Sequence, residues 1–422
     1  MKVWPVKHSP LLRQPERFIA RDELKSLIQK VTHNLVNIHD KTGEFLLRLD
    51  DGRVIDTKGW AGWEWTHGVG LYGIWQYYCQ TGDEGMREII DSWFADRFAE
   101  GATTKNVNTM SPFLTLAYRY EETKNPAWLP WLESWAEWAM NEMPRTEHGG
   151  MQHITLAEEN HQQMWDDTLM MTVLPLAKIG KLLNKPEYVE EAIYQFLLHV
   201  QNLMDRETGL WFHGWNYDGN HNFARARWAR GNSWLTIVIP DFLELVDLPE
   251  NNAVRRYLVQ VLNAQIAALA KCQDESGLWH TLLDDPDSYL EASATAGFAY
   301  VRHSESRAQA LCRRRVRRGG GESDSRHRAK HLAGRGAAAN VLRDGDGERS
   351  GVLPPDTADF DAVWPGNGDS VSDGIFAEIF LIIKNPALAG FLFYIRSTVS
   401  IPRVSRPSFS VFAVSCASFR RL

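Results

Sequence analysis

The sequence lacks the features that mark several classes of protein. Its four cysteines, at positions 79, 272, 312 and 416, show no paired spacing, so neither a disulfide scaffold nor a zinc site is indicated. The N-terminal stretch MKVWPVKHSPLLRQPERF lacks the apolar core of a secretory signal, so we expect a reducing, cytoplasmic location. The only candidate membrane anchor, residues 374–394, is interrupted by Lys384-Asn-Pro, so no membrane partner is expected.

Charge and motif content exclude further functions. Lysine and arginine number 46 against 53 aspartates and glutamates, and the formal net charge of −7 gives no general attraction to nucleic acid. No phosphate-binding glycine loop and no GxSxG nucleophile elbow occurs. Because His153, His161 and His213 are neither close in sequence nor paired with carboxylates four residues away, no metal site is expected.

Tryptophan is abundant: the chain has 17, and 16 of them precede residue 300. In that part of the chain apolar residues recur at helical spacing, and few segments alternate with period two. The length of 422 residues is enough to bury a large core. The pattern predicts an all-α fold, with helices over 22–38, 66–80, 83–99, 109–122, 127–142, 166–183, 186–203, 231–247, 252–271 and from 292 onward.

Turns of one type recur between these helices. Asp40-Lys-Thr-Gly, Asp205-Arg-Glu-Thr-Gly and Asp274-Glu-Ser-Gly are variants of one sequence, and weaker relatives contain Gly101 and Gly150. The marker glycines lie about 50 to 70 residues apart, which is the length of one helical hairpin with its loop. This spacing predicts stacked helix pairs that share a core.

The sequence changes character after Tyr300. Residues 301–335 contain ten arginines and one lysine, and no sustained helical period follows. A basic nucleic-acid arm would mix lysine with arginine, whereas a shift of reading frame near residue 301 accounts for the abrupt change. A shifted frame permits Glu-Gly-Glu-Leu-Leu-Gln over residues 334–339, which would add another turn glycine at the repeat spacing. We therefore expect residues 301–422 to be an out-of-frame, disordered tail.

The densest group of reactive side chains is His153 with the segment Trp165-Asp166-Asp167. Adjacent acids before an apolar run are typical of a helix N-terminus, which is one interpretation of Asp166. Asp167 lies between Trp165 and the apolar run Leu169-Met-Met. Apolar neighbours raise the pKa of a carboxyl group, as a general acid working near neutral pH requires. We therefore expect the pKa of Asp167 to be raised and Asp167 to be catalytic.

Tryptophans beside glycine or histidine at the starts of helices are candidates for stacking on sugar faces. These are Trp60, Trp63, Trp65, Trp228 and Trp234. Arg230, between the last two, could form either a structural salt bridge or a bidentate clamp on a substrate carboxylate. A different set recurs at helical spacing, which predicts packing: Trp128, Trp131, Trp135 and Trp138.

Four motifs, in this order, resemble the unsaturated rhamnogalacturonyl hydrolases of glycoside hydrolase family 105, which are relatives of the unsaturated glucuronyl hydrolases. The motifs are GGMQH ending at His153, QMWDD ending at Asp167, GLWFH ending at His213, and WARGNSW from Trp228 to Trp234. The resemblance covers roughly residues 20–300. It implies an (α/α)₆ barrel whose last hairpin is missing, with residues 1–300 as the incomplete catalytic domain.

Carried over motif by motif, the resemblance implies a role for each residue. Asp167 corresponds to the catalytic acid/base. Asn108 stands where the family often has a second aspartate, and it could hydrogen-bond the substrate or Asp167 but could not titrate. No metal and no organic cofactor is implied. The remaining implied substrate-binding residues are Trp65, His153, Trp165, His213, Trp228, Arg230 and Trp234.

The implied substrate is a small oligosaccharide, the 4,5-unsaturated galacturonyl-rhamnose left when a lyase cuts the pectin backbone. The implied reaction is hydration of its enol ether. Two alternatives stay open. A conventional inverting glycosidase on a similar barrel would need a second carboxylate, such as Glu64 or Asp218. The chain could also be non-catalytic, either a sugar-binding remnant or the translation of a frameshifted pseudogene. The oligomeric state is not indicated.

Overall fold

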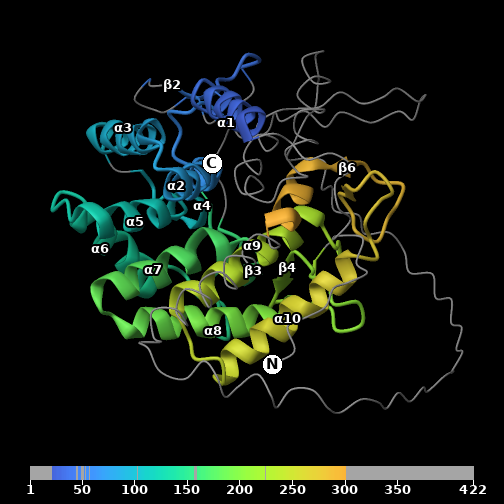
Figure 1. Cartoon of the computed structure of the whole chain (residues 1–422). Coiled ribbons are helices and arrows are strands. Elements are labelled where there is room, and N and C mark those ends of the chain that lie inside the picture. Colours follow the sequence, from blue (N-terminus) through green and yellow to red (C-terminus); the bar gives the residue numbers. More distant parts are fainter. Residues whose placement is uncertain are drawn as a thin grey trace, which may run out of the picture.

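The computed structural model describes residues 21–43, 46–48, 52, 54–56, 58–101, 103–155, 159–223 and 225–300. The expected out-of-frame tail, 301–422, lies outside the described residues. Helices dominate the described part of the chain, which confirms the all-α prediction (Figure 1). The α-helices are α1 Arg21–Val36, α2 Trp65–Thr81, α3 Glu84–Glu100, α4 Val107–Met110, α5 Phe113–Thr123, α6 Leu129–Glu137, α7 Leu174–Leu183, α8 Pro186–Leu203, α9 Ala229–Val246 and α10 Ala253–Leu269.

Two predicted helices contain π-helical turns. Trp138–Glu142 continues α6, and Leu169–Val173 leads into α7. The predicted helix that starts at 292 is helical as far as Tyr300, where the described residues end. A π turn adds one residue to the helical repeat, and such turns are frequent at functional sites. The turn at Leu169–Val173 follows Asp167 directly.

The helices form an inner and an outer layer. Along α2 every residue from Thr66 to Trp75 is buried, so this helix is enclosed on all sides. In α3, by contrast, the buried residues are Met86, Ile90, Trp93, Phe94 and Arg97, a single face of an amphipathic outer helix. The inner helices α2, α5, α7 and α9 contact one another in that order, and α3, α6, α8 and α10 pack outside them. This is the (α/α)₆ barrel architecture.

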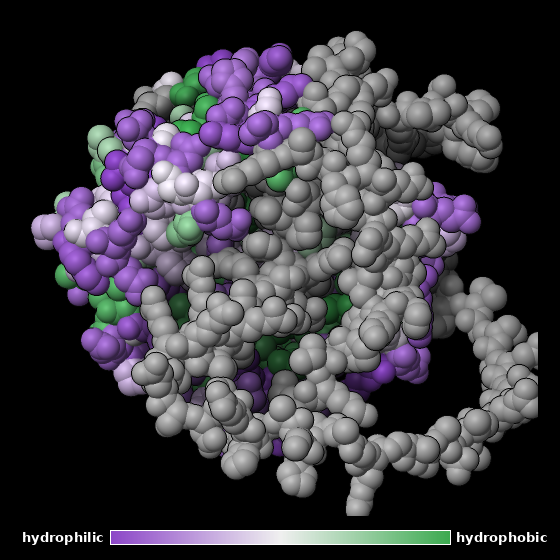
Figure 2. Space-filling view, viewed as in Figure 1, coloured by the Kyte–Doolittle hydropathy of each residue, from purple (hydrophilic) through white to green (hydrophobic). Residues whose placement is uncertain are grey.

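A buried polar cluster crosses the interior of the barrel. The hydroxyl groups of Tyr72 on α2 and Tyr300 both donate to the Asp241 carboxylate on α9, at 2.9 and 3.0 Å. Asp241 is buried, so these bonds satisfy a charge that would otherwise be costly to enclose. They link three inner helices, which are α2, α9 and the helix that ends at Tyr300. The periphery seen in Figure 2 is, in contrast, predominantly hydrophilic.

Three short antiparallel strand pairs, which the sequence pattern does not predict, connect loops between the helices. They are β1 Leu46–Arg48 with β2 Val54–Asp56, β3 Gln163–Trp165 with β4 Gly214–Asn216, and β5 Trp279–His280 with β6 Leu290–Glu291. Strands of two or three residues are too short to show alternation. No described helix is long and apolar enough to cross a membrane.

The repeated turn is present, with one correction. Gly43, Gly101, Gly209 and Gly277 all have positive φ, but in the third of the five copies the residue with positive φ is Gly149 and not Gly150. In the Asp205 copy the aspartate accepts hydrogen bonds from Glu207 N–H and the Thr208 hydroxyl, which fix the turn.

Candidate active site

The predicted site residues lie where the inner helices begin. Trp65 is the first residue of α2, Asn108 lies in α4, Asp167 precedes the π turn before α7, and Arg230 is in the first turn of α9. Contacts join these helix starts: the rings of Trp65 and Trp234 lie 5.6 Å apart, edge to face. Each outer helix returns the chain to the same end, so segments distant in sequence converge there.

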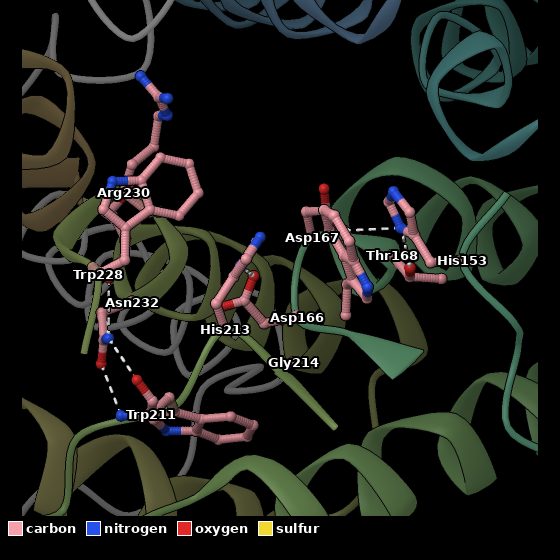
Figure 3. A network of polar contacts seen from close by, with 12 residues as sticks. His153, Asp166, Asp167, Thr168, Trp211, His213, Gly214, Trp228, Arg230 and Asn232 are labelled. Atoms are coloured by element: carbon pink, nitrogen blue, oxygen red, sulfur yellow. Dashed lines mark hydrogen bonds and ion pairs between the residues drawn. The ribbon is translucent and has the colours of Figure 1, made fainter. Parts of the chain in front are cut away.

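The strand pair β3–β4 brings the second and third motifs together. Trp165 is paired with Gly214, so the residues that flank them, Asp166 and His213, become neighbours. The Asp166 N–H donates to the His213 carbonyl at 2.9 Å. Figure 3 shows the result, with His153 and Asp167 on one side of His213 and with Trp228 and Arg230 on the other.

Asp167 is partly exposed and lies next to a histidine. Its carboxylate is 3.4 Å from His153 Nδ1, and its side chain is 18% exposed while that of His153 is 3% exposed. The His153 ring stacks on Trp165 with centroids 4.0 Å apart. Burial raises the pKa of such a carboxyl, but the attraction of His153 and His213 outweighs it, and the pKa of Asp167 is lowered. The expectation of a raised pKa is therefore wrong, because the histidines that the fold brings to Asp167 outweigh the effect of its burial.

Asp166 does not cap a helix, so that interpretation is also wrong. Its side chain has no exposed surface and accepts a hydrogen bond from His213 Nδ1 at 2.8 Å. The residue at the start of the π turn is Thr168 instead. Burial raises the pKa of Asp166 to about 6, although His213 opposes the shift. Although the two aspartates are adjacent, the pKa of Asp166 is raised and the pKa of Asp167 is lowered.

Trp228 and Arg230 form the other side of the site. The Arg230 guanidinium lies 4.4 Å above the Trp228 ring, and its Nη1 is 3.4 Å from the Glu291 carboxylate. Arg230 therefore forms a salt bridge and stacks on an aromatic ring at the same time. The sequence did not indicate Glu291, since it lies 61 residues from Arg230 in a two-residue strand.

The tryptophans divide differently from the prediction. Trp63 is stacked on Trp135 at 6.0 Å and packs against Trp93, so its ring takes part in an aromatic cluster beside the core. Trp60 packs against Trp93 as well. Trp234 is only 2% exposed, and its ring packs edge to face against the ring of Trp65. The candidate tryptophans that are partly exposed are Trp60, Trp63, Trp65, Trp165 and Trp228.

Asn108 has a carboxyl partner. Its side-chain amide hydrogen-bonds to Glu64, the residue directly before α2. Burial raises the pKa of Glu64 to about 7, and the bond from Asn108 opposes the rise. From the sequence, Glu64 was predicted only as a possible second carboxylate of an inverting glycosidase. Asp218, the other carboxylate named there, has an exposed side chain that pairs with His161 at 3.0 Å. Within the described residues no group of three or more potential ligands could hold a metal ion.

A partly exposed aspartate and aromatic rings at the starts of the inner helices are the groups that a glycoside hydrolase uses to protonate a sugar and to stack on it. The chain belongs to Glycosyl Hydrolase Family 88, whose family model matches residues 37–304. It resembles the unsaturated rhamnogalacturonyl hydrolase YesR of Bacillus subtilis (strain 168), with 34% identity over 239 residues, 56% of this chain and 69% of that protein.

Two solved structures are more similar. A possible member of the GH105 family from Salmonella enterica subsp. enterica serovar Paratyphi A is 89% identical, with a TM-score of 0.68 over 73% of this chain and 81% of that chain. Another from Klebsiella pneumoniae subsp. pneumoniae is 85% identical, with the same TM-score and coverage. The predicted relationship to the rhamnogalacturonyl hydrolases and the predicted barrel fold are confirmed.

Proposed function

We propose that this chain releases a 4,5-unsaturated galacturonyl residue from rhamnogalacturonan oligosaccharides by hydrating its double bond. The observation that carries the proposal is the position of Asp167, a partly exposed carboxyl between His153 and a set of tryptophans. The 34% identity to an unsaturated rhamnogalacturonyl hydrolase supports the substrate class.

The reaction needs one group that gives and then takes a proton. Asp167 donates a proton to C4 of the unsaturated uronate, and water adds at C5. The proton that this water loses returns to Asp167. The hemiketal formed at C5 then opens by breaking its bond to the ring oxygen, which leaves a ketone at C5 and a hemiacetal at C1. The hemiacetal breaks its bond to the rhamnose oxygen and becomes an aldehyde, and its hydroxyl proton passes to the rhamnose. An ordinary glycosidase separates these tasks between two carboxylates at a set distance, whereas hydration lets Asp167 do both.

The lowered pKa of Asp167 is compatible with its role as an acid once substrate is bound. In the absence of substrate, His153 and His213 favour the ionised form of Asp167. The uronate carboxylate brings a second negative charge into the site, and a like charge disfavours ionisation. Substrate binding therefore raises the pKa of Asp167 toward the range in which it can deliver a proton.

The test follows the ultraviolet absorbance of the conjugated uronate. Purified protein is mixed with the unsaturated galacturonyl-rhamnose disaccharide and, in a parallel reaction, with the saturated disaccharide. The absorbance is expected to fall and rhamnose to appear only with the unsaturated sugar. Release of rhamnose from the saturated disaccharide would instead favour the inverting glycosidase. That mechanism needs two carboxyl groups, which would be Asp167 and Glu64, the acid hydrogen-bonded to Asn108.

A further inference from the structure

The pair formed by Asp166 and His213 is a built feature behind the site that the proposed reaction does not use. Asp166 has no exposed surface and His213 is 5% exposed. Two hydrogen bonds join them, one from His213 Nδ1 to the Asp166 carboxylate at 2.8 Å and one from the Asp166 N–H to the His213 carbonyl at 2.9 Å. Because both the backbone and the side chain are paired, the orientation of the imidazole is fixed.

The start of α9 accommodates this pair closely. The second carboxylate oxygen of Asp166 has no hydrogen-bond partner in the described part of the chain and lies against Gly231. A Cβ at position 231 would be 2.5 Å from that oxygen and 3.2 Å from His213 Nδ1. Only a residue without a side chain leaves room for the carboxylate there. The first turn of a helix also favours a negative charge, which stabilises the ionised form of Asp166.

The electrostatics of the pair favour a charged histidine. Burial alone would lower the pKa of His213, but the attraction and hydrogen bond of Asp166 outweigh it, and the pKa of His213 is raised. The other titratable groups around the pair are Asp167 and His153 beside the π turn, Arg230 on α9 and His199 on α8. Asp167 favours the charged imidazole and Arg230 opposes it.

The free nitrogen of this imidazole faces the site. Among the described residues no hydrogen-bond partner contacts His213 Nε2. In Figure 3 that nitrogen points away from Asp166, toward the space between Arg230 and Asp167. The edges of Trp165 and Trp228 flank the ring at 5.0 and 4.8 Å between centroids and hold it in place.

We propose that Asp166 is a positioning residue that holds His213 as an imidazolium, whose Nε2–H donates a hydrogen bond to the carboxylate of a bound uronate. The uronate as ligand rests on the proposed function, whereas the charge of His213 does not. A neutral His213 with its proton on Nδ1 would present a lone pair at Nε2 and would repel a carboxylate. The role of Asp166 is therefore to keep the imidazole doubly protonated, so that Nε2 carries a donor hydrogen as well as Nδ1.

The first measurement is the pH titration of the His213 imidazole by NMR in the full chain with isotope-labelled histidine, assigned with His213→Gln. In the parent chain we expect His213 to be charged at neutral pH. In Asp166→Asn the side-chain amide oxygen still accepts from Nδ1–H, but the negative charge is gone, so burial makes His213 neutral. A parent chain with a neutral His213 would overturn the proposal even if the variant failed to fold.

The second measurement is the affinity for galacturonate and for rhamnose at neutral pH, by calorimetry. Loss of one charge-assisted hydrogen bond is expected to weaken galacturonate binding in Asp166→Asn by about tenfold or more, with rhamnose binding unchanged. The matched control is Asp241→Asn, which also removes a buried carboxylate but leaves Asp166 and His213 in place. Unchanged galacturonate affinity in Asp166→Asn, or an equal loss in Asp241→Asn, would contradict the proposal.

These readouts separate the inference from the proposed function. If the unsaturated disaccharide is not hydrolysed but the Asp166 variant loses its charged His213 and its galacturonate affinity, the proposed reaction fails and the inference stands. If the disaccharide is hydrolysed while His213 is neutral in the parent chain, the inference fails and the proposed function stands.

Discussion

At the scale of single residues, Asp166 and Asp167 show how one peptide bond separates two chemical roles. Strand β3 ends at Trp165, and the chain turns at Asp166 and Asp167 into the π turn. In this turn Asp166 points into the protein toward His213, and Asp167 lies in the partly exposed site beside His153. The sequence indicates that both are important, but it cannot indicate which of them is buried.

Replacing Asp167 tests its role as the proton donor and acceptor. Asp167→Asn preserves the shape of the side chain but can neither give nor take a proton, so we expect kcat to fall by about 10³-fold. KM for the unsaturated disaccharide should not rise, because the variant removes a negative charge that disfavours the uronate carboxylate. The rate is measured from the loss of uronate absorbance. A variant that retains a tenth of the parent kcat would exclude Asp167 as the acid.

Glu64 gives a prediction about stability and pH. Its pKa is about 7 in the folded protein and 4.5 in an ordinary environment, so the unfolded chain loses this proton first as pH rises. The free energy of unfolding due to Glu64 is therefore fully present below pH 4.5 and is lost between pH 4.5 and 7.

Glu64→Gln removes the cost of burying the charge. We expect the variant to be more stable than the parent chain above pH 7, by up to about 3 kcal/mol, and to be similar to it below pH 4.5. Thermal unfolding at a series of pH values measures the difference. A pH-independent difference would mean that Glu64 is not protonated in the folded chain.

The limits of sequence-based prediction are clearest for residues that meet across long separations. Asp166 and His213 are 47 residues apart, and their contact depends on the register of two three-residue strands. Trp63 and Trp65 stand in one motif, yet Trp63 packs in the aromatic cluster beside the core and Trp65 lies in the site. Both have the same local sequence environment, so only the direction of the chain before α2 distinguishes them.

At the scale of elements, helices were predictable because each carries its own signal. The apolar period and the bounding turns place most of the helices to within a few residues of their observed positions. The exceptions are the predicted helix 109–122, which is two helices, α4 and α5, and α7, which begins at Leu174 after the π turn. The π turn at Leu169–Val173 was not predictable, since a single extra residue leaves the apolar period nearly unchanged. It nevertheless affects the site, because it changes the path of the backbone just after Asp167.

The repeated turn offers a matched pair of substitutions. Gly209 and Gly277 occupy equivalent places in two copies, with φ of 84° and 87°. A Cβ at 209 would lie 2.8 Å from the Ala264 carbonyl oxygen on α10, whereas one at 277 would meet nothing within 4 Å. Gly277→Ala therefore measures the conformational cost alone, about 1–2 kcal/mol.

Gly209→Ala adds a steric conflict with the backbone of α10. We expect it to destabilise the protein by about 1–3 kcal/mol more than Gly277→Ala does, as overpacking typically costs. Chemical denaturation of both variants gives the two free energies of unfolding. Equal losses would show that α10 shifts to accommodate the methyl group, and that the close approach of this turn to α10 does not contribute to stability.

At the scale of the whole molecule, the question is where the native protein ends. We propose that the reading frame shifts near codon 301. The tryptophan-rich, helical part of the sequence stops there, and the family match ends at residue 304. The Salmonella structure that is 89% identical covers 73% of this chain. The net charge of −7 then averages over an arginine-rich tail, and the barrel itself is more acidic.

Restoring the frame tests this proposal together with the activity. An (α/α)₆ barrel needs its last helix pair to cover the apolar faces beside the first pair, and an uncovered apolar face promotes aggregation. We expect the frame-restored chain to be more soluble than the chain as written and to hydrolyse the unsaturated disaccharide faster. Soluble yield and turnover are compared in parallel, and Asp167→Asn in the restored chain confirms that any gain comes from this site. Equal solubility and turnover in the two chains, or a gene whose intact frame encodes Arg313-Arg-Arg, would show that residues 301–422 belong to the working protein.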